Sequence, residues 1–252
     1  MIRAVLFDLG GTLHTCHSDE KTKLRFAKLL LERLEDYDIR LDMTPEALAA
    51  QLAVNGEIYK HATEQNLREL EPAVIWNDYY LREQAIGLER LRPIAEELSF
   101  RYDYERVRNL RRPGLRECMD RLKGMGLRLG VISNIISRSI VPHFLAEYGL
   151  TEDMEVVLTS AGTGIRKPSP LIFRMAEERL GLEATHLAYV GDTLSRDVLG
   201  VRNAGWRLAI QISNPSSAHR DAHLAGSGLE PDYRVGRLAE IPDIIQQENA
   251  RF

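Results

Sequence analysis

The chain has 252 residues, with 33 Lys and Arg against 37 Asp and Glu, and its net charge of −4 excludes the strongly basic surface of a typical nucleic-acid-binding protein. Its composition, 44% hydrophobic and 28% charged, is ordinary for a soluble globular protein, and no apolar run approaches the length of about 18 residues that spans a membrane. The two cysteines, Cys16 and Cys118, form neither a disulfide framework nor a metal-ligand pattern, so we expect a reducing, cytoplasmic location with no nucleic-acid or membrane partner.

The N-terminal residues 1–8 predict a short buried strand that ends on a carboxylate. In "AVLFDLGGTL" (residues 4–13), four apolar residues lead into Asp8, and a Gly-Gly-Thr turn follows. Taken alone, Asp8 has two interpretations. It is either a turn former or helix N-cap, or a residue of a functional site at the end of the strand.

Residues 18–110 show helical patterns and no convincing strand. Pro45 and Pro93 fall where a first helical turn is expected. We interpret the arginines at positions 108, 111 and 112 as a solvated surface cluster, and the aromatic residues of "EPAVIWNDYY" (71–80) as core of this helical segment. The pattern predicts an inserted helical module with long helices over Lys23–Tyr37, Thr44–Thr63 and Trp76–Leu91.

From residue 113 onward, short apolar runs alternate with segments of helical periodicity. This alternation predicts right-handed crossovers and a parallel sheet covered by helices on both faces. The expected strands are Leu127–Ile132, Glu155–Leu158, Leu187–Val190, Trp206–Ile212 and Tyr233–Val235. The expected helices are Gly114–Lys123, Ser137–Tyr148, Pro170–Leu180, Ser195–Ala204 and Leu238–Gln247.

Polar residues follow the expected strands at the edge where such a sheet binds ligands. Ligands of doubly wound sheets lie outside the carboxyl ends of the strands. Two acids, a hydroxyl, an amide and a lysine meet at this edge, a set that suits a divalent cation and a phosphate. These residues are Asp8, Ser133, Asn134, Asp192 and, from the segment "GTGIRKPSP", Lys167.

Four segments in order resemble motifs I to IV of the haloacid dehalogenase-like (HAD) hydrolases: "VLFDLGGTL", "LGVISN", "GIRKPSP" and "AYVGDTLSRDVLGVRNAGW". The resemblance covers the whole chain. It implies an α/β fold in which residues 1–17 and 111–252 form a Rossmann-like core with a doubly wound parallel sheet. Residues 18–110 would form an all-helical cap of the C1 type, which leaves room for small-molecule substrates, in a monomer or homodimer.

The resemblance also implies a role for each residue that handles phosphate. Asp8 would be the nucleophile that forms an aspartyl-phosphate, and Thr12 would support the motif I turn. Ser133 and the backbone N–H of Asn134 would bind the transferring phosphoryl oxygens. Lys167 would neutralise charge on both the nucleophile and the phosphate.

A magnesium site is implied at the same edge. Asp8, the backbone carbonyl of Gly10 and Asp192 would ligate Mg²⁺. Asp197 would lie behind them, either supporting the ligands or beginning the following helix. The cation is required because an anionic nucleophile must approach an anionic phosphate.

Gly10 departs from the phosphatase pattern D-x-D-x-T, whose second Asp protonates the leaving group and later deprotonates the hydrolytic water. General acid–base help of this kind contributes about 10²–10⁴-fold in rate. A glycine retains the carbonyl for the metal and loses the proton donor. The nearest titratable candidates for a stand-in are His14, His17 and Asp19, although each is also an ordinary polar loop residue.

The main hypothesis is therefore a Mg²⁺-dependent phosphatase with altered motif I chemistry that acts on a small phosphorylated metabolite. One alternative is a metal-independent 2-haloacid dehalogenase, against which Asp192 argues, and which would need a cap arginine such as Arg25, Arg33 or Arg40. A second alternative is a HAD-fold binding module whose catalysis has lapsed. A minor option, a phosphonoacetaldehyde hydrolase, would need a Schiff-base lysine from among Lys21, Lys23, Lys28 and Lys60.

Overall fold

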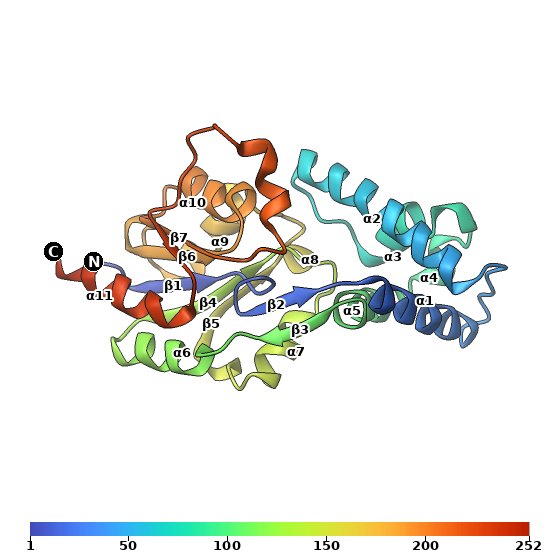
Figure 1. Ribbon diagram of the computed structural model, residues 1–252, viewed down its shortest axis with the longest axis horizontal. Helices are drawn as coiled ribbons and strands as arrows, with labels where there is room; N and C mark the ends of the chain where they lie inside the picture. Colours follow the sequence, from blue (N-terminus) through green and yellow to red (C-terminus); the bar gives the residue numbers. More distant parts are fainter. Residues whose placement is uncertain (252) are drawn as a thin grey trace.

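The computed structural model describes residues 1–251, and a parallel sheet of six strands in the order β5-β4-β1-β6-β7-β8 forms its centre (Figure 1). All neighbouring strands of this sheet pair in parallel, which confirms the predicted doubly wound α/β fold. Each predicted strand is present, and its ends differ by at most two residues except at the start of β1, which begins at Ala4 rather than at residue 1. The strands are β1 (Ala4–Phe7), β4 (Arg128–Ser133), β5 (Met154–Thr159), β6 (Leu187–Gly191), β7 (Leu208–Ile212) and β8 (Tyr233–Val235).

Strand β1 lies between β4 and β6 and is buried on both faces. Its side chains alternate, so that Val5 and Phe7 join one hydrophobic cluster while Ala4 and Leu6 join the other. A central strand of a doubly covered sheet needs such an uninterrupted apolar run. The burial of "AVLF" therefore follows from its central position.

Helices cover the two faces in separate layers (Figure 1). The first cluster contains α6, α7 and α11, and the second contains α9 and α10. The predicted helix over 195–204 begins as a π-helical turn, η5, and the one over 238–247 begins as a 3₁₀ turn, η7. The bounds are α6 (Leu115–Gly124), α7 (Ile140–Glu147), η3 (Thr151–Asp153), α8 (Ser160–Thr163), α9 (Pro170–Leu180), η4 (Ala184–His186), η5 (Leu194–Val198), α10 (Leu199–Ala204), η6 (Ala218–Leu224), η7 (Leu238–Glu240) and α11 (Ile241–Ala250).

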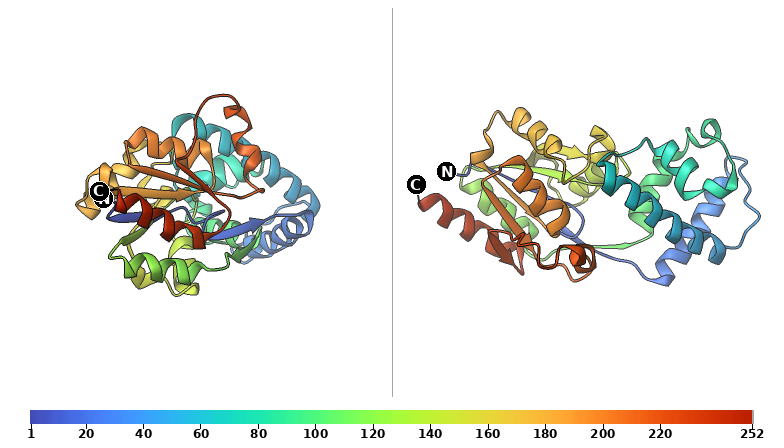
Figure 2. Two further views of the ribbon diagram at one scale, coloured as in Figure 1. Left: turned by 60° about the vertical axis from the view of Figure 1, so that its left-hand side comes forward. Right: turned by 90° about the horizontal axis from the view of Figure 1, so that it is seen from above.

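A helical region, residues 20–105, packs around a third hydrophobic cluster and lies at the end of the core away from both termini (Figure 2). Trp76 is fully buried there and its Nε1 donates to Ser99 Oγ at 3.0 Å, so the expected core position of this tryptophan is confirmed. No helix within residues 1–251 is long and apolar enough to cross a membrane. The elements are α1 (Glu20–Glu35), α2 (Pro45–Asn66), α3 (Pro72–Ile75), η1 (Trp76–Tyr80), η2 (Arg82–Gln84), α4 (Leu88–Leu91) and α5 (Ala95–Glu105).

The prediction of one continuous helix over Trp76–Leu91 is wrong. The segment is π-helical at η1, tightens into a 3₁₀ turn at η2, and resumes only at α4. Ala85 and Gly87 have φ angles of +46° and +96°, which no α-helix of L-residues accommodates. Apolar spacing alone did not reveal this break.

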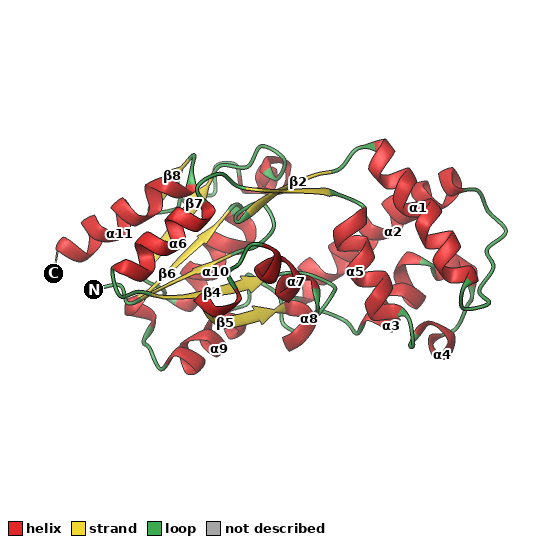
Figure 3. Cartoon of the chain, turned by 90° about the horizontal axis from the view of Figure 1, so that it is seen from below, coloured by secondary structure: helices red, strands yellow, loops and turns green. Residues whose placement is uncertain are grey.

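A two-stranded antiparallel ribbon joins the core to the helical region (Figure 3). It pairs β2 (His14–His17) with β3 (Arg108–Arg111). Because β3 begins inside residues 18–110, the expectation of no strand in that segment is wrong. The predicted limits of the helical segment, residues 18 and 110, fall just after β2 and inside β3. Arg112 is not simply solvated either, because its guanidinium donates to the carbonyl oxygens of Gly11, at 2.6 Å, and Ser213, at 2.8 Å.

A buried ion pair fastens the helical region to the core on the other side. Glu69, in the loop after α2, accepts hydrogen bonds from Arg166, Tyr59 and Ser160. Backbone bonds flank the pair, with Glu69 N–H donating to Gly164 O at 3.1 Å and Arg166 N–H to Leu67 O at 3.0 Å. We call this set of contacts the Glu69–Arg166 tether.

The tether leads to a stability prediction. Arg166→Met leaves the buried Glu69 carboxylate without its cation, and we expect a loss of about 3–5 kcal/mol in the free energy of unfolding, measured by urea titration. Arg138→Met is the matched control, because the Arg138–Glu71 pair also joins the two parts but its side chains are 53% and 67% exposed. Such a pair contributes about 0–1 kcal/mol, and equal losses in the two variants would contradict this role of the tether.

Candidate active site

Three polar residues mark the carboxyl ends of the three central strands. Asp8 follows β1, Ser133 ends β4, and Asp192 follows β6. In the sheet, β1 lies between β4 and β6. After β1 the chain adds β4 and β5 on one side and then crosses to add β6, β7 and β8 on the other, so the strand order reverses at β1. Ligands of doubly wound folds bind at such a switch point.

The hydrogen bonds to the Asp8 carboxylate converge on one oxygen. Oδ1 accepts from the backbone N–H of Leu9 at 2.8 Å and from the Ser133 hydroxyl at 2.9 Å, and it lies 3.1 Å from the Lys167 ammonium. Within residues 1–251, no hydrogen bond reaches Oδ2. The carboxylate is thus held in place by one oxygen while the other is left for chemistry.

The Lys167 ammonium is almost completely buried and is held from several sides. Besides Asp8, its Nζ lies 2.7 Å from Asp197 Oδ1, 2.7 Å from the Tyr189 hydroxyl and 3.0 Å from the carbonyl oxygen of Ile132. The Tyr189 hydroxyl itself donates to that carbonyl at 2.5 Å. Lys167 is therefore a fixed positive charge next to Asp8.

Asp197 serves Lys167 rather than the open site. Its second oxygen accepts from the backbone N–H of Thr193 at 2.9 Å and from the Thr193 hydroxyl at 2.7 Å. Burial alone would raise the pKa of Asp197, but the charge and hydrogen bond of Lys167 outweigh it and hold the pKa below its ordinary value. Asp197 is ionised and both of its oxygens are occupied.

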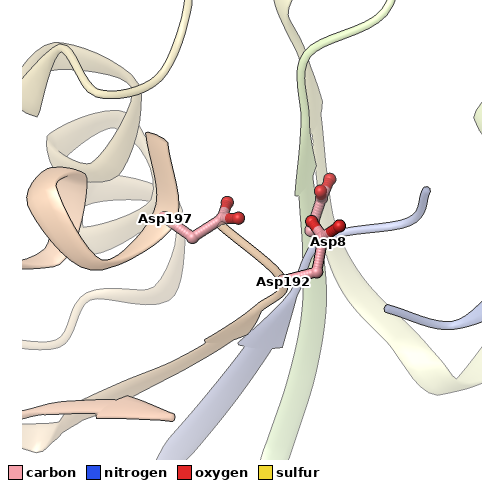
Figure 4. Close-up of side chains that lie close together, drawn as sticks. All are labelled: Asp8, Asp192 and Asp197. Atoms are coloured by element: carbon pink, nitrogen blue, oxygen red, sulfur yellow. The ribbon is translucent and has the colours of Figure 1, made fainter. Parts of the chain in front are cut away.

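Asp192 completes a cluster of three buried carboxylates. One oxygen each of Asp8, Asp192 and Asp197 lies within 4.8 Å of the others, and in Figure 4 Asp197 points toward the other two. Burial first, and then the negative charges of Asp197 and Asp8, raise the pKa of Asp192 to about 6. The Asn214 amide donates to its Oδ2 at 2.7 Å.

Two glycines allow the acids to approach the backbone so closely. A Cβ on Gly11 would overlap Oδ2 of Asp192, and the φ of Gly11 is +88°. A Cβ on Gly191 would overlap the side chain of Asp197. Gly10 is different, because a Cβ there would meet only Cys16 Sγ, at 3.7 Å, which is an ordinary contact. Nothing in the local backbone requires a glycine at position 10.

Asn134 and Thr12 differ in how firmly the structure engages them. The Asn134 amide pairs with the backbone of Lys167, donating to its carbonyl at 2.9 Å and accepting from its N–H at 2.8 Å, and so positions the loop that carries the lysine. The Thr12 hydroxyl is buried and has no hydrogen-bond partner within residues 1–251. The motif I turn is closed by backbone bonds instead, from Thr12 N–H and Leu13 N–H to Leu9 O.

None of the three stand-in acids suggested by the sequence suits the role. His17 and Asp19 are exposed, and Asp19 caps α1 by accepting from Thr22 N–H at 2.8 Å. His14 does line the cavity above Asp8, but its Nδ1 lies 3.0 Å from the Tyr148 hydroxyl. Burial, and secondarily the charge of Arg112, lower the pKa of His14 to about 4, so it is neutral near pH 7 and has no acidic proton to give.

The cavity over Asp8 has a volume of about 240 Å³ and a wall that the sequence did not reveal. The helical region contributes Asp103 and Arg106, and the core contributes Arg196 and Arg220. Burial raises the pKa of Asp103 to about 7, against the opposing charge of Arg106. Of these residues only Arg196 lies inside a quoted motif, between Asp192 and Asp197. The others reach the cavity through tertiary packing that no local pattern announces.

Comparison with known proteins places this geometry in a family. Residues 2–205 match the family model described as haloacid dehalogenase-like hydrolase. A glyceraldehyde 3-phosphate phosphatase of Methanopyrus kandleri is 24% identical over 256 residues, which cover 98% of each chain. A ribulose-1,5-bisphosphate 5-phosphatase of Halopiger xanaduensis is 28% identical over 134 residues, 53% of this chain, and the match spans only 56% of that relative.

The fold is also found in a solved structure of a protein that is named as a dehalogenase. A 2-haloacid dehalogenase of Pseudomonas syringae pv. Tomato superposes with a TM-score of 0.67 over 98% of this chain and 99% of that one, at 22% identity. This similarity extends to the fold only. With a family model that spans most of its length and the acidic cluster at the switch point of its sheet, the chain belongs to the haloacid dehalogenase-like hydrolases.

Proposed function

We propose that the chain is a phosphatase that hydrolyses a small phosphorylated metabolite through an aspartyl-phosphate on Asp8. The observation that supports this best is the asymmetry of the Asp8 carboxylate, whose Oδ1 is held by Ser133 and Lys167 while Oδ2 is left for attack. Both curated relatives described above are named as phosphatases of small sugar phosphates, which supports the same reaction.

The proposed reaction has two chemical steps, formation of the aspartyl-phosphate and its hydrolysis. Asp8 Oδ2 attacks phosphorus, a bond from Asp8 to phosphorus forms, and the bond to the leaving oxygen breaks. The leaving oxygen takes its proton from Asp103, the cavity acid whose pKa is raised to about 7. Water then attacks phosphorus, the bond to Asp8 breaks, and inorganic phosphate leaves. Lys167 offsets the negative charge shared by Asp8 and the phosphoryl group, while Ser133 and the Asn134 N–H hold its oxygens.

The buried acids fit Mg²⁺. Three carboxylates and one ammonium leave two negative charges uncompensated among these four groups. The pKa of Asp192 is raised first by burial and then by the charges of the other two acids. Asp8, Asp192 and the Gly10 carbonyl would hold the ion, since both oxygens of Asp197 are already occupied. When bound, Mg²⁺ supplies positive charge where the nucleophile and the phosphate meet.

Residues 18–110 act as the cap in this proposal. The β2–β3 ribbon connects them to the core. They line the cavity through two residues of α5 and three residues after it, which are Tyr102, Asp103, Arg106, Val107 and Asn109. A cap over the strand ends excludes water from the aspartyl-phosphate until hydrolysis. The cavity of about 240 Å³ suits a small molecule.

The alternative functions find less support. Arg25 and Arg33, two of the arginines considered for a dehalogenase, pair with Glu105 and Glu97, and Arg40 is exposed. None of the three lines the cavity among the residues the structure describes. Asp192 also places an additional buried acid where a metal-free reaction has no use for it. A lapsed binding module would not need the complete network that holds Lys167.

The first test is the cation and nucleophile requirement. We expect hydrolysis of p-nitrophenyl phosphate to need both Mg²⁺ and Asp8, so that chelator or Asp8→Asn abolishes phosphate release. Chloride release from L-2-chloropropionate that is indifferent to chelator would instead identify a dehalogenase. No turnover of either compound, with Mg²⁺ bound in calorimetry, would identify a binding module.

The second test concerns the proton donor that is missing at position 10. Gly10→Asp is sterically allowed, and we expect it to raise kcat/KM for alkyl phosphates, whose leaving groups need a proton, by about 10-fold or more. Activated aryl phosphates should respond much less, because their leaving groups depart as anions. A variant that folds and binds Mg²⁺ but shows no selective gain would contradict this account of Gly10.

The third test concerns Asp103, the acid on the opposite wall of the cavity. Since its pKa is raised to about 7, it carries a proton for part of the time at neutral pH, as a general acid must. We expect Asp103→Asn to lower kcat for alkyl phosphates by about 10²-fold or more and to leave aryl phosphate turnover nearly unchanged. The matched control is Asp42→Asn, an exposed acid of the helical region outside the cavity. Equal losses on both substrate types would assign Asp103 a structural role.

A further inference from the structure

Three arginines converge on the cavity from separate segments of the chain. Arg106 follows α5 of the helical region, Arg196 lies in η5 after β6, and Arg220 lies in η6 after β7. All three also line an adjoining cavity of about 380 Å³ between the helical region and the core. Asp8, the proposed nucleophile, lines the first cavity but not the second. The arginines therefore stand beyond the reacting end of the site, where the two cavities meet.

These arginines lack the acidic partners that neighbouring cations have. Lys23, Lys60 and Arg166, which also line the second cavity, pair with Glu20, Glu57 and Glu69 respectively. In the part of the chain that the structure describes, none of the three arginines forms an ion pair. The three arginines therefore give this wall of the cavity a net positive charge.

Asp103 is the one acid on this wall that is not committed to a lysine, and it does not restore the balance. Burial raises its pKa to about 7, so its negative charge is incomplete near neutral pH. Even when it is fully ionised, this one carboxylate is outnumbered by the three guanidinium groups that line the same two cavities. The net charge of this wall is therefore positive in either protonation state of Asp103, and Arg220 is the member that also interacts electrostatically with Asp192 and Asp8 at the other end of the first cavity.

Arg106 also has unused hydrogen-bonding capacity. Its guanidinium carbon lies 4.3 Å from the centre of the Tyr102 ring, which orients the group. Its Nε is buried and has no hydrogen-bond partner within residues 1–251. A buried donor without an acceptor is costly, and a planar guanidinium is suited to bind carboxylate or phosphate through two parallel hydrogen bonds.

We propose that Arg106, Arg196 and Arg220 form a subsite for a second anionic group of the substrate, so that the enzyme prefers phosphate monoesters with a carboxylate or a further phosphate at the other end. This inference rests on the proposed phosphatase function. Ser133 and Lys167 hold the reacting phosphate at Asp8, and the arginine subsite binds the distal anion across the junction of the two cavities. Binding energy from this distal group positions the reacting phosphate.

The test uses substrates that differ only in the distal group. 3-Phosphoglycerate and glycerol 3-phosphate share a three-carbon skeleton, but only the first ends in a carboxylate. Fructose 1,6-bisphosphate and fructose 6-phosphate make the corresponding comparison for a phosphate. We expect kcat/KM to favour the anionic member of at least one pair by about 10- to 100-fold, mainly through KM. The pair that shows the preference identifies which anion the subsite takes.

Arginine variants distinguish a loss of distal-anion binding from a general loss of activity caused by misfolding. Arg106→Gln, Arg196→Gln and Arg220→Gln should each reduce the preference, with a larger loss for the anionic substrate than for its uncharged counterpart. Arg101→Gln is the matched control on α5, since Arg101 pairs with Glu97 and lies outside both cavities. Equal turnover of both members in each pair, or equal losses on both members in all three variants, would overturn the proposal.

A binding measurement distinguishes failure of the subsite from failure of the phosphatase function. Asp8→Asn cannot form the aspartyl-phosphate, so calorimetry with this variant and Mg²⁺ reports binding alone. We expect the anionic member of the favoured pair to bind about 10-fold or more tightly than its counterpart. Tighter binding without turnover in the unmodified enzyme would leave the subsite standing and refute the phosphatase function. Turnover with no difference in affinity would leave the phosphatase function standing and refute the subsite.

Discussion

The arrangement of the site depends on one buried ammonium shared by two carboxylates. Lys167 lies between Asp8 and Asp197, at 3.1 and 2.7 Å, and each of these three charges would be costly to bury without the others. The requirement extends outward, because Asp197 can reach Lys167 only where residue 191 lacks a Cβ. Asn134 in turn fixes the backbone of Lys167. Residues that lie far apart in the sequence are thus coupled by the need to compensate charge in a buried environment.

This coupling explains why the sequence was informative about the core of the site. The strands are mostly apolar, so their carboxyl ends could be located within one residue, and parallel strands bring these ends to one edge of the sheet. Asp8, Ser133 and Asp192 are adjacent in space because of that rule alone. Lys167 and Asp197 follow from the motifs that surround them, and their contacts agree with the charges expected there.

No comparable rule predicts from the sequence which residues form the cavity wall opposite Asp8. Asp103 lies in the last turn of α5 and Arg106 is the residue that caps its C-terminal end, a spacing of about one turn that any solvated helix end also shows. Their position depends on how the helical region docks. That docking uses the β2–β3 ribbon, whose four-residue strands are polar and carry no alternating pattern. It also depends on the break at Ala85 and Gly87, where backbone geometry overrides the apolar spacing. Sequence patterns report burial along one element, whereas this wall is a property of several elements packed together.

The tether connects these two halves of the molecule through adjacent residues. Arg166 binds Glu69 of the helical region, and the next residue, Lys167, binds Asp8. One short segment therefore fixes both the positive charge beside Asp8 and the loop that follows α2 in the helical region. A shift of the helical region relative to the core either breaks the buried Glu69–Arg166 pair or moves the backbone of Lys167, which Asn134 holds at 2.8 Å. Because both alternatives are unfavourable, the width of the cavity is set by the same residues that hold the charges around Asp8 in place.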